Sequence, residues 1–380
     1  MRIGYGRCGV TRGLSICVAL KGELMSTNVS VVRIGIIGTG GWGTRGHLTA
    51  YHRSPLAQIV AACDVNPENL ASAASQFGIP ATYADYRELL TSQPLDLVDV
   101  STPNVTHAEI SLAAIARQVN VLCEKPLGIN RHEAREMVAV ANRAGVKTAV
   151  NFTYRQVPAA RFIRQMIQSG ELGEIYHIIA TYNQGHLVDP EAPRVWRLHK
   201  AMTGTGVLGD LGSHLIDLAR HWFGDFQRVQ GHLKTFVHER PLSGGGRGPV
   251  DVDDAASFLA EFANGATGVF FCTRYAFARA NTQRIEIYGT KGGVVYDNER
   301  PDEIQFATGD FMGSQRQYCV MPVPRNIVET RTTNMEQFVE DVATGLSRTA
   351  TFADGAACQE VLDAIEESAS TGTWARVPLD

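Results

Sequence analysis

The sequence lacks a marked excess of charge of either sign, with 35 Lys and Arg residues against 39 Asp and Glu. A surface without a basic excess does not attract polyanions, so we expect neither nucleic acid nor an anionic membrane as a partner. The sequence also lacks a long apolar run, because no stretch approaches the roughly 18–20 residues that a membrane span requires. These absences argue against the nucleic-acid-binding and membrane-spanning classes.

The sequence has few cysteines, and none of the seven forms a Cys-x-x-Cys pair. Cys63 and Cys123 fall at the ends of predicted buried strands. We therefore interpret the cysteines as reduced thiols and expect a cytoplasmic location. With 380 residues and 44% hydrophobic content, the chain can bury a large core, and it exceeds the size at which single cores stop growing. We expect two domains.

Residues 1–30 fit poorly with the rest of the chain. Arginines followed by apolar residues 14–20 faintly resemble a secretory signal, but Lys21 ends this short region without a small-residue cleavage site. A misassigned start codon is the alternative, because residues 21–23, just before Met25, match a translated purine-rich ribosome-binding site. We predict that residues 1–24 are disordered and that the natural protein begins at Met25. N-terminal sequencing of protein from the native locus tests this, and a start at Met1 would contradict it.

A buried strand followed by a glycine-rich turn organises the first half of the chain. Residues 33–37 are apolar after Arg33, which is typical of a strand buried on both faces of a parallel sheet. A Gly-x-Gly-x-x-Gly pattern follows, which permits a tight turn, close approach of a pyrophosphate and close packing of the next helix. The predicted pyrophosphate-binding residues are Gly38, Thr39, Gly40, Gly41, Trp42 and Gly43.

The next strand, residues 58–63, ends at Asp64, 21 positions beyond Gly43. A Rossmann fold places the carboxylate that binds the adenosine ribose at this spacing. Asn66 and Pro67 already supply a helix cap, so we expect the Asp64 carboxylate to be free for the ribose. No Lys or Arg lies between Asp64 and Arg87 to neutralise a 2′-phosphate. The predicted cofactor is therefore NAD rather than NADP.

Strands and helices continue to alternate to residue 152, with later strands at 95–100, 120–123 and 147–152. Six strands with intervening helices predict a Rossmann, doubly wound parallel sheet over residues 31–152. Its ligand should lie across the carboxyl ends of the strands. Further predicted cofactor-binding residues at or just beyond these ends are Ser101, Thr102, Pro103, Asn104, His107, Glu124, Lys125 and Asn151.

The pattern changes beyond residue 152. A helix at 158–170 precedes a strand at 175–181, and strands 257–262 and 267–272 flank Asn264-Gly265, a strong hairpin signal. Residues 284–288 and 294–296 predict another hairpin, and helices are expected near 334–346 and 356–370. The second domain, residues 153–380, is therefore expected to be α+β with a large, mostly antiparallel sheet. Residues 244–248 are interpreted as a flexible surface loop.

Several ordered motifs resemble the Gfo/Idh/MocA family, which includes glucose-fructose oxidoreductase and inositol dehydrogenase. They are the glycine-rich turn, residues 101–104 with His107, Glu124-Lys125-Pro126, residues 151–155 and residues 209–214. The resemblance runs from about Val31 to the C-terminus. It implies the same two domains, a catalytic role for Lys125, Asp210 and His214, and substrate contacts from Tyr154 and Arg155. It also implies a homodimer or homotetramer formed through the outer face of the second sheet.

The predicted chemistry centres on Asp210 and His214, about one helical turn apart. A carboxylate beside an imidazole can orient it and stabilise its protonated form, which suits proton transfer. Helix capping and a core histidine are the structural alternative. A metal pair is a third option, but no further ligands are apparent nearby, and we predict no metal. Asp210 should raise the pKa of His214 and Lys125 should lower it, which leaves the direction open.

Lys125, at the carboxyl edge of the sheet, is expected to stabilise an alkoxide on the substrate, and Trp196 and Arg197 are expected to line the cleft. The leading hypothesis is an NAD-dependent dehydrogenase that acts on a secondary hydroxyl of a sugar, inositol or related cyclic polyol. One alternative is a redox-neutral glycosidase or epimerase that retains its cofactor. Another is a non-catalytic sugar sensor on the same scaffold.

Overall fold

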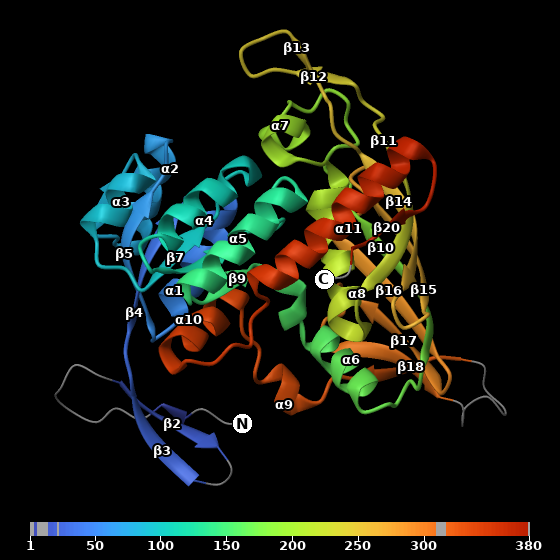
Figure 1. Cartoon of the computed structure of the whole chain (residues 1–380), viewed down its shortest axis with the longest axis horizontal. Coiled ribbons are helices and arrows are strands. Elements are labelled where there is room, and N and C mark those ends of the chain that lie inside the picture. Colours follow the sequence, from blue (N-terminus) through green and yellow to red (C-terminus); the bar gives the residue numbers. More distant parts are fainter. Residues whose placement is uncertain (1–3, 6–13, 21–22, 309–316, 379–380) are drawn as a thin grey trace.

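The computed structural model describes residues 4–5, 14–20, 23–308 and 317–378. Figure 1 shows a helix-rich unit built around the first parallel sheet, beside a second unit dominated by a larger sheet. This arrangement confirms the predicted fold class.

The first sheet has six parallel strands in the order β6-β5-β4-β7-β8-β9, as expected for a doubly wound fold. Val98, Val100 and Val121 are completely buried, because helices cover both faces of the sheet. The strands are β4 (Val32–Ile37), β5 (Ala57–Cys63), β6 (Ala81–Tyr83), β7 (Leu97–Val100), β8 (Asn120–Cys123) and β9 (Thr148–Val150).

The helices between these strands begin and end at the signals in the sequence. Asn66 caps α2 and Asn130 caps α5, and left-handed glycines, Gly78 and Gly145, end the same two helices. The first helical segment after the glycine-rich turn is a π-helical turn. The segments are η1 (Gly43–Leu48), α1 (Thr49–Arg53), α2 (Pro67–Phe77), α3 (Tyr86–Ser92), η2 (Asn104–Thr106), α4 (His107–Ile115) and α5 (Arg131–Ala144).

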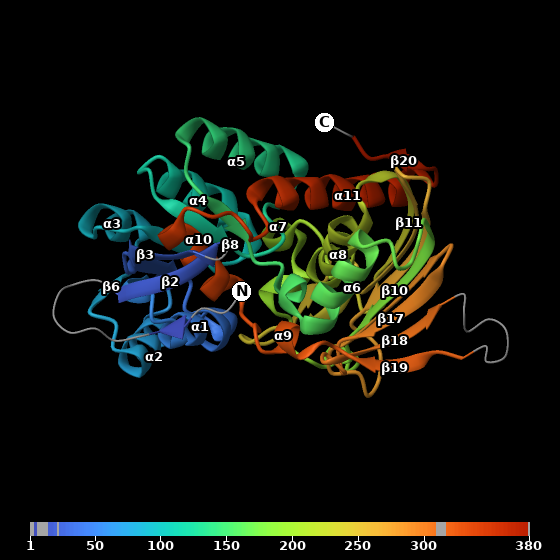
Figure 2. The same cartoon turned by 90° about the horizontal axis from the view of Figure 1, so that it is seen from below.

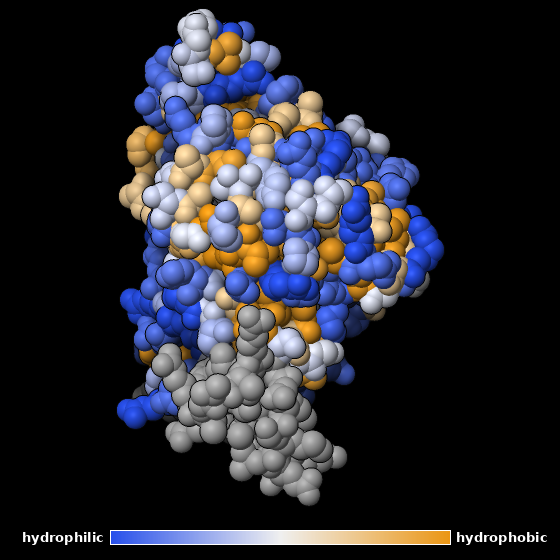
Figure 3. Space-filling view, turned by 90° about the vertical axis from the view of Figure 1, so that its left-hand side faces the viewer, coloured by the Kyte–Doolittle hydropathy of each residue, from blue (hydrophilic) through white to orange (hydrophobic). Residues whose placement is uncertain are grey.

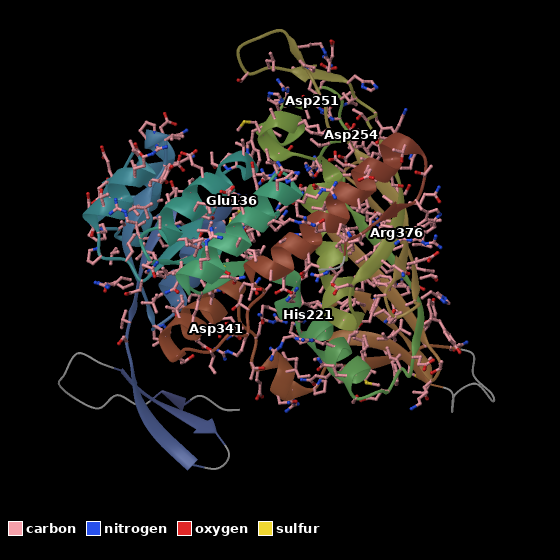
Figure 4. The ribbon with its side chains drawn as sticks, in the orientation of Figure 1. Glu136, His221, Asp251, Asp254, Asp341 and Arg376 are labelled. Carbon is pink, nitrogen blue, oxygen red and sulfur yellow. The ribbon has the colours of Figure 1, made fainter. Side chains whose placement is uncertain are left out.

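Helix α10 (Asn334–Thr344) packs on the first sheet, although the sequence suggested that everything after residue 152 belongs to the second domain. Met335, Phe338 and Val339 share one core cluster with apolar residues of β4, β7, β8 and β9. The buried carboxylate of Asp341, labelled in Figure 4, accepts hydrogen bonds from the segment that follows the helix. The nucleotide-binding unit is therefore discontinuous in sequence.

Within the described residues the second sheet has nine strands in the order β19-β18-β17-β16-β10-β15-β14-β11-β20, of which only β10 and β15 pair in parallel. Gly265, at φ +88°, makes the predicted hairpin between β14 and β15. The strands are β10 (Ile175–Asn183), β11 (Phe226–Lys234), β14 (Ala255–Phe262), β15 (Thr267–Thr273), β16 (Thr282–Gly289), β17 (Gly292–Asp297), β18 (Glu303–Thr308), β19 (Cys319–Pro322) and β20 (Ala375–Arg376).

Helices α6 (Pro158–Gln168), α8 (Ser213–Phe223) and α11 (Phe352–Thr371) cover one face of this sheet, as Figure 2 shows from below. Residues alternate between buried and exposed along β14 and β15, so the other face is uncovered in the single chain. Several large apolar side chains lie exposed on strands β10, β14, β15 and β19 of this sheet: Tyr176, Ile179, Leu259, Val269, Phe271 and Val320.

A smaller group of elements extends from the top of the second unit in Figure 1. Strands β12 (Glu239–Pro241) and β13 (Arg247–Pro249) pair around a turn with Gly245 and Gly246 at positive φ, so the expected surface loop is the tip of a hairpin. The completely buried Arg240 donates hydrogen bonds to the carbonyls of Leu187 and Asp189. The remaining elements are η3 (Thr153–Gln156), η4 (Trp196–Leu198), α7 (Lys200–Thr203), η5 (Leu208–Gly212) and α9 (Arg325–Val328).

The N-terminal extension contains strands β1 (Gly4–Tyr5), β2 (Leu14–Leu20) and β3 (Glu23–Val29), which pair only with one another. Several residues for which we expected disorder thus lie in strands, whereas residues 1–3, 6–13 and 21–22 lie outside the described part of the chain. A start at Met25 would remove β1 and β2 and leave most of β3 without its partner. That start stays a prediction.

Candidate active site

One cavity of about 1170 Å³ runs across the carboxyl ends of the first sheet and reaches the second domain. Besides Lys125, twelve of the residues predicted for the site line it in the first domain: Gly38, Gly40, Gly41, Trp42, Gly43, Asp64, Ser101, Thr102, Pro103, Asn104, Glu124 and Asn151. Lys125, Tyr154, Trp196, Arg197, Asp210 and His214 line it as well. The predicted cofactor and substrate groups therefore share one space.

The glycine-rich turn has the form that a dinucleotide requires. Gly38 has φ +98°, and a side chain at Gly43 would come within 2.2 Å of the Gly38 carbonyl oxygen. At Gly40, by contrast, a Cβ atom would meet no other atom within 4 Å, so the turn leaves open space above it. A pyrophosphate can approach the backbone N–H groups there. The observed geometry thus fits the cofactor predicted from the sequence.

Asp64 lines the cavity, but its carboxylate is not free as expected. Oδ2 accepts hydrogen bonds from the backbone N–H and hydroxyl of Thr39, at 2.7 and 3.0 Å, and Oδ1 accepts one from the Asn66 N–H at 2.8 Å. Each oxygen of a carboxylate can accept more than one hydrogen bond, and Oδ1 has used only one. Asp64 can still accept from a ribose hydroxyl, whereas the buried Thr39 acts by holding Asp64 and does not line the cavity.

His107 also departs from its predicted role, because it is completely buried and does not line the cavity. Its ring nitrogens contact the carbonyl oxygens of Pro126 and Thr102 at 2.9 and 3.0 Å. Burial holds the pKa of His107 below its usual value, against the effect of these two carbonyls. His107 therefore ties the segment after β7 to the segment after β8, and it supports the cofactor-binding residues without contacting the cavity.

Glu124 is held by residues that follow two other strands of the first sheet, β4 and β9. Its Oε1 atom accepts hydrogen bonds from Trp42 Nε1 at 2.8 Å and from Asn151 Nδ2 at 2.5 Å, and it lies 2.9 Å from His47 Nε2. Burial disfavours the carboxylate, but the hydrogen bond and charge of His47 outweigh that cost and lower the pKa of Glu124 to about 2. His47 was not predicted, because its partners are distant in the sequence.

Lys125 belongs to a second charged group, with Asp210 and Arg274. Lys125 Nζ donates to the Asp210 carboxylate and to its backbone carbonyl, both at 2.9 Å, and Arg274 Nη2 lies 2.8 Å from the other carboxylate oxygen. Burial disfavours the ionised Asp210, but the charges of Lys125 and Arg274 hold its pKa well below the usual range. The Asp210 carboxylate therefore pairs with these two cations, and no hydrogen bond joins it to His214.

His214 lines the cavity among aromatic rings, with its centroid 4.8 Å from that of Tyr154. Its Nδ1 atom is buried without a hydrogen-bond partner in the described part of the chain, so Nε2 is the nitrogen available to a ligand. Burial and the charge of Lys125 lower the pKa of His214 to about 3, against the effect of Asp210. The structure therefore settles the direction that the sequence left open, and the imidazole is neutral.

A polar wall beside His214 joins the predicted Tyr154 to three residues that the sequence did not predict. Tyr182 donates to Asn281 Oδ1 at 2.6 Å, Asn281 Nδ2 donates to the Tyr154 hydroxyl at 2.9 Å, and the two tyrosine hydroxyls lie 2.6 Å apart. Gln184 donates to the same Asn281 oxygen at 2.7 Å. All four residues line the cavity, so the wall can exchange hydrogen bonds with a hydroxylated ligand. Asn281 gives no local sequence signal, because it lies in a loop.

Arg155 does not contribute to the cavity, contrary to the prediction. Its guanidinium forms a bidentate pair with the buried Asp217 of α8 and also contacts Asp354 at the start of α11, at 3.0 Å. Burial alone would lower the pKa of Arg155, but these two carboxylates raise it above its usual value. Arg155 therefore joins two helices behind the site. Arg197, in contrast, lies over the ring of Trp196, and both line the cavity as expected.

Two general features complete the description. No group of three or more His, Cys, Asp or Glu side chains in the part of the chain with described side chains is arranged to hold a metal. None of the described helices is both long and apolar enough to cross a membrane. Figure 3 shows that polar and apolar atoms intermingle over the side of the molecule that carries the nucleotide-binding unit.

Comparisons with known proteins agree with this geometry. Curated relatives include levoglucosan dehydrogenase of Pseudarthrobacter phenanthrenivorans, 34% identical over 91% of this chain and 98% of the relative. Inositol 2-dehydrogenase of Rhizobium meliloti is 26% identical over 89% of this chain and 96% of the relative. Among solved structures, levoglucosan dehydrogenase in complex with NADH and levoglucosan has a TM-score of 0.86, with 34% identity, covering 92% of this chain and all of the other.

Family comparisons cover both domains. Residues 32–152 match the model for the oxidoreductase family with an NAD-binding Rossmann fold, and residues 160–295 match the GFO/IDH/MocA C-terminal domain. An oxidoreductase domain protein from Kribbella flavida has a TM-score of 0.87, with 36% identity, covering 92% of this chain and all of the other. The cofactor of the Rossmann domain is NAD. The chain thus belongs to the Gfo/Idh/MocA family of NAD-binding oxidoreductases.

Proposed function

We propose that the protein oxidises a secondary hydroxyl of a sugar, inositol or related cyclic polyol to a ketone, or catalyses the reverse reduction. The observation that carries this proposal is the shared cavity, in which the glycine-rich turn, Lys125 and the neutral His214 all face one space. NAD, when bound, accepts or supplies the hydride. The relatives named for levoglucosan, inositol and D-apiose support a sugar or polyol as the substrate class.

In this proposal His214 exchanges the hydroxyl proton through Nε2, as base in oxidation and as acid in reduction. Lys125 lies at the same end of the cavity and stabilises negative charge on the substrate oxygen. Asp210 and Arg274 hold the Lys125 ammonium group in position. Tyr154 and its neighbours Tyr182 and Asn281 bind other hydroxyls of the ring.

A substrate screen tests the proposal. Purified protein is incubated with NAD and a panel of inositols, hexoses, aminosugars, sugar phosphates and levoglucosan, and the absorbance of NADH is followed. Net NADH formation with at least one polyol is the expected result. Product without net NADH would favour the redox-neutral glycosidase or epimerase, and binding without turnover of any compound would favour the sensor.

NAD is proposed as the preferred cofactor over NADP. The Asp64 carboxylate would repel a 2′-phosphate, and Arg87, which also lines the cavity, is already paired with Asp85 and Glu109.

We also propose that two or four copies associate through the exposed apolar face of the second sheet, because large exposed apolar patches mark association sites. Light scattering coupled to gel filtration measures the number of copies.

A cytoplasmic location is proposed because the described cysteines are free thiols. Cys63, Cys123, Cys272 and Cys358 are buried free thiols, and burial raises the pKa of each. Reduced thiols of this kind suit a reducing compartment. Fractionation of cells that express the native gene tests this location.

A further inference from the structure

A buried chain of three ionisable groups lies beneath the cavity at the end of the first sheet nearest Lys125. Asp99 on β7 contacts His47 Nδ1 at 2.7 Å, and His47 Nε2 contacts Glu124 at 2.9 Å. His47 and Asp99 are completely buried, and only Glu124 lines the cavity. The proton transfer proposed for Lys125 and His214 makes no use of Asp99.

The charges of Asp99, His47 and Glu124 follow from the hydrogen bonds among them. Burial disfavours a charged His47, but the two carboxylates outweigh it and raise its pKa to about 10. The Asp99 Oδ2 atom accepts from His47 and from the Tyr51 hydroxyl, whereas Oδ1 is buried without a partner among the described residues. With one proton in each of the two contacts of the ring, the two carboxylates and the imidazole together carry one negative charge.

That charge is costly, because a buried carboxylate oxygen without a partner loses its hydration. With the adenosine end at Asp64 and the pyrophosphate at the glycine-rich turn, the nicotinamide ring would lie in the part of the cavity that Glu124 and Asn151 line. This ring carries a positive charge when oxidised and none when reduced, and a nearby negative charge distinguishes the two forms.

We propose that Asp99, acting through His47 and Glu124, favours binding of oxidised over reduced cofactor. Asp99 is a positioning residue in this role, since it touches neither the cavity nor the substrate. The group on the substrate side, formed by Lys125, Asp210 and Arg274, carries a net positive charge and opposes the effect. The proposal rests on NAD binding alone, so failure of the proposed sugar oxidation would leave it standing.

The test is the substitution Asp99→Asn. The amide oxygen can accept from His47 and Tyr51 as Oδ2 does, and the amide nitrogen takes the place of the unpartnered Oδ1. The substitution also removes one of the two carboxylates that raise the pKa of His47, so the titrations are made near pH 6, where His47 keeps its proton most readily. The dissociation constants for NAD⁺, NADH and ADP-ribose, which lacks the ring, are measured by calorimetric titration. The ratio of the NAD⁺ constant to the NADH constant should rise roughly four- to fifteen-fold, as for a unit charge about 10–20 Å away at an effective dielectric constant of about 20.

The matched control is Tyr51→Phe, which removes a hydrogen bond from Asp99 but no charge, and it should change the ratio less than about twofold. ADP-ribose affinity should stay the same in both variants. An unchanged ratio in Asp99→Asn, or an equal change in Tyr51→Phe, would overturn the proposal. Should Asp99→Asn fail to fold, Asp99→Ser, which is smaller and equally neutral, replaces it in the same comparison.

Discussion

Lys125 and Asp210 face each other across the boundary between the two domains, with Nζ bonded both to the Asp210 carboxylate and to its backbone carbonyl at 2.9 Å. The Asp210 carboxylate thereby forms ion pairs with Lys125 and Arg274, and His214 has no carboxylate partner among the described residues. The site thus separates its charges, with the ion pairs beside a neutral imidazole. This arrangement differs from the Asp–His pair that the spacing of residues 210 and 214 suggested.

Replacing His214 with Ala should lower the oxidative rate by roughly 10²–10⁴, the usual contribution of general acid–base catalysis. NAD affinity should remain nearly unchanged, because the pyrophosphate and ribose contacts lie in the other domain. Steady-state rates on the identified substrate and NAD titrations measure the two effects. The control is His199→Ala, since His199 is exposed and does not line the cavity. Near-normal turnover of His214→Ala would show that another group takes the proton.

Removing the charge of Lys125 should change how the rate depends on pH. With its pKa near 3, His214 stays neutral and able to accept a proton as the pH falls from 8 to 5. In Lys125→Met the pKa of His214 should rise, because the lysine is the main nearby charge that lowers it. The acid limb of kcat/KM should therefore move to higher pH, at lower overall turnover. An acid limb at the same pH in both proteins would contradict this account.

The two groups also act on one substrate oxygen. The double variant Lys125→Met/His214→Ala should therefore lose less than the product of the two single fold-losses, because the first substitution already removes part of what the second group supports. Multiplicative losses would show that the two residues act independently.

Stability should be greatest near pH 6.5. Burial is the chief reason that the pKa values of His214 and His221 are lowered to about 3 in the folded protein. Below pH 6.5 the unfolded chain therefore binds more protons than the folded protein, and the stability falls as the pH drops toward 3. His47 has the opposite shift, to about 10, and its contribution is lost as the pH rises from 6.5 through 10. Figure 4 shows His221 on α8, away from the first sheet.

Thermal unfolding followed by circular dichroism from pH 4 to 10 measures both limbs. In His47→Gln the alkaline limb should flatten, while the acid limb contributed by His214 and His221 should persist. A wild-type melting temperature that rises steadily from pH 7 to 10 would contradict the charged state of His47.

Arg155→Ala should destabilise the protein by about 3–5 kcal/mol, because it leaves the buried Asp217 without a counter-charge. Urea denaturation measures the loss. Substrate KM should stay close to normal in the protein that remains folded, since Arg155 does not line the cavity. A stable variant with a strongly raised KM would instead show that Arg155 contributes to substrate binding. Arg87→Ala, an exposed ion pair, is the control and should cost about 1 kcal/mol or less.

Cofactor choice should depend on Asp64. The wild-type protein should have a higher kcat/KM with NAD than with NADP, and Asp64→Ser should reduce that preference by removing the charge that opposes a 2′-phosphate. The measurement compares kcat/KM for both cofactors in both proteins. Because Asp64 also holds Thr39, NAD affinity should fall as well. A wild-type preference for NADP would reject the assignment.

The sequence predicted the first sheet well, because each strand and helix cap is signalled locally. Asn66, for example, caps its helix as predicted. The predictions that failed depend on contacts distant in sequence. Arg155 pairs with a residue 62 positions away, and Arg274 reaches Asp210 across 64 positions. Neither partner leaves a periodic or local signal in the chain.

Asp64 illustrates a different limit of sequence reasoning. Its position after the second strand was predicted, but the hydrogen bonds to Thr39 depend on how closely two turns approach, which spacing alone does not fix. For His214, the direction of its pKa shift required knowing that burial and Lys125 together outweigh Asp210. Motifs therefore identified the residues of the site, while three-dimensional packing determined their charges.

Helix α10 imposes an order on how the protein is made. The ribosome completes the six strands of the first sheet by residue 150, yet α10, which covers β4, β7, β8 and β9, emerges only after residue 334. During nearly two hundred residues of synthesis, one apolar face of the nascent sheet lacks its cover. A gene fragment ending at residue 152 should therefore yield an aggregation-prone polypeptide, whereas fusing residues 331–346 to that fragment through a flexible linker should restore a soluble nucleotide-binding unit.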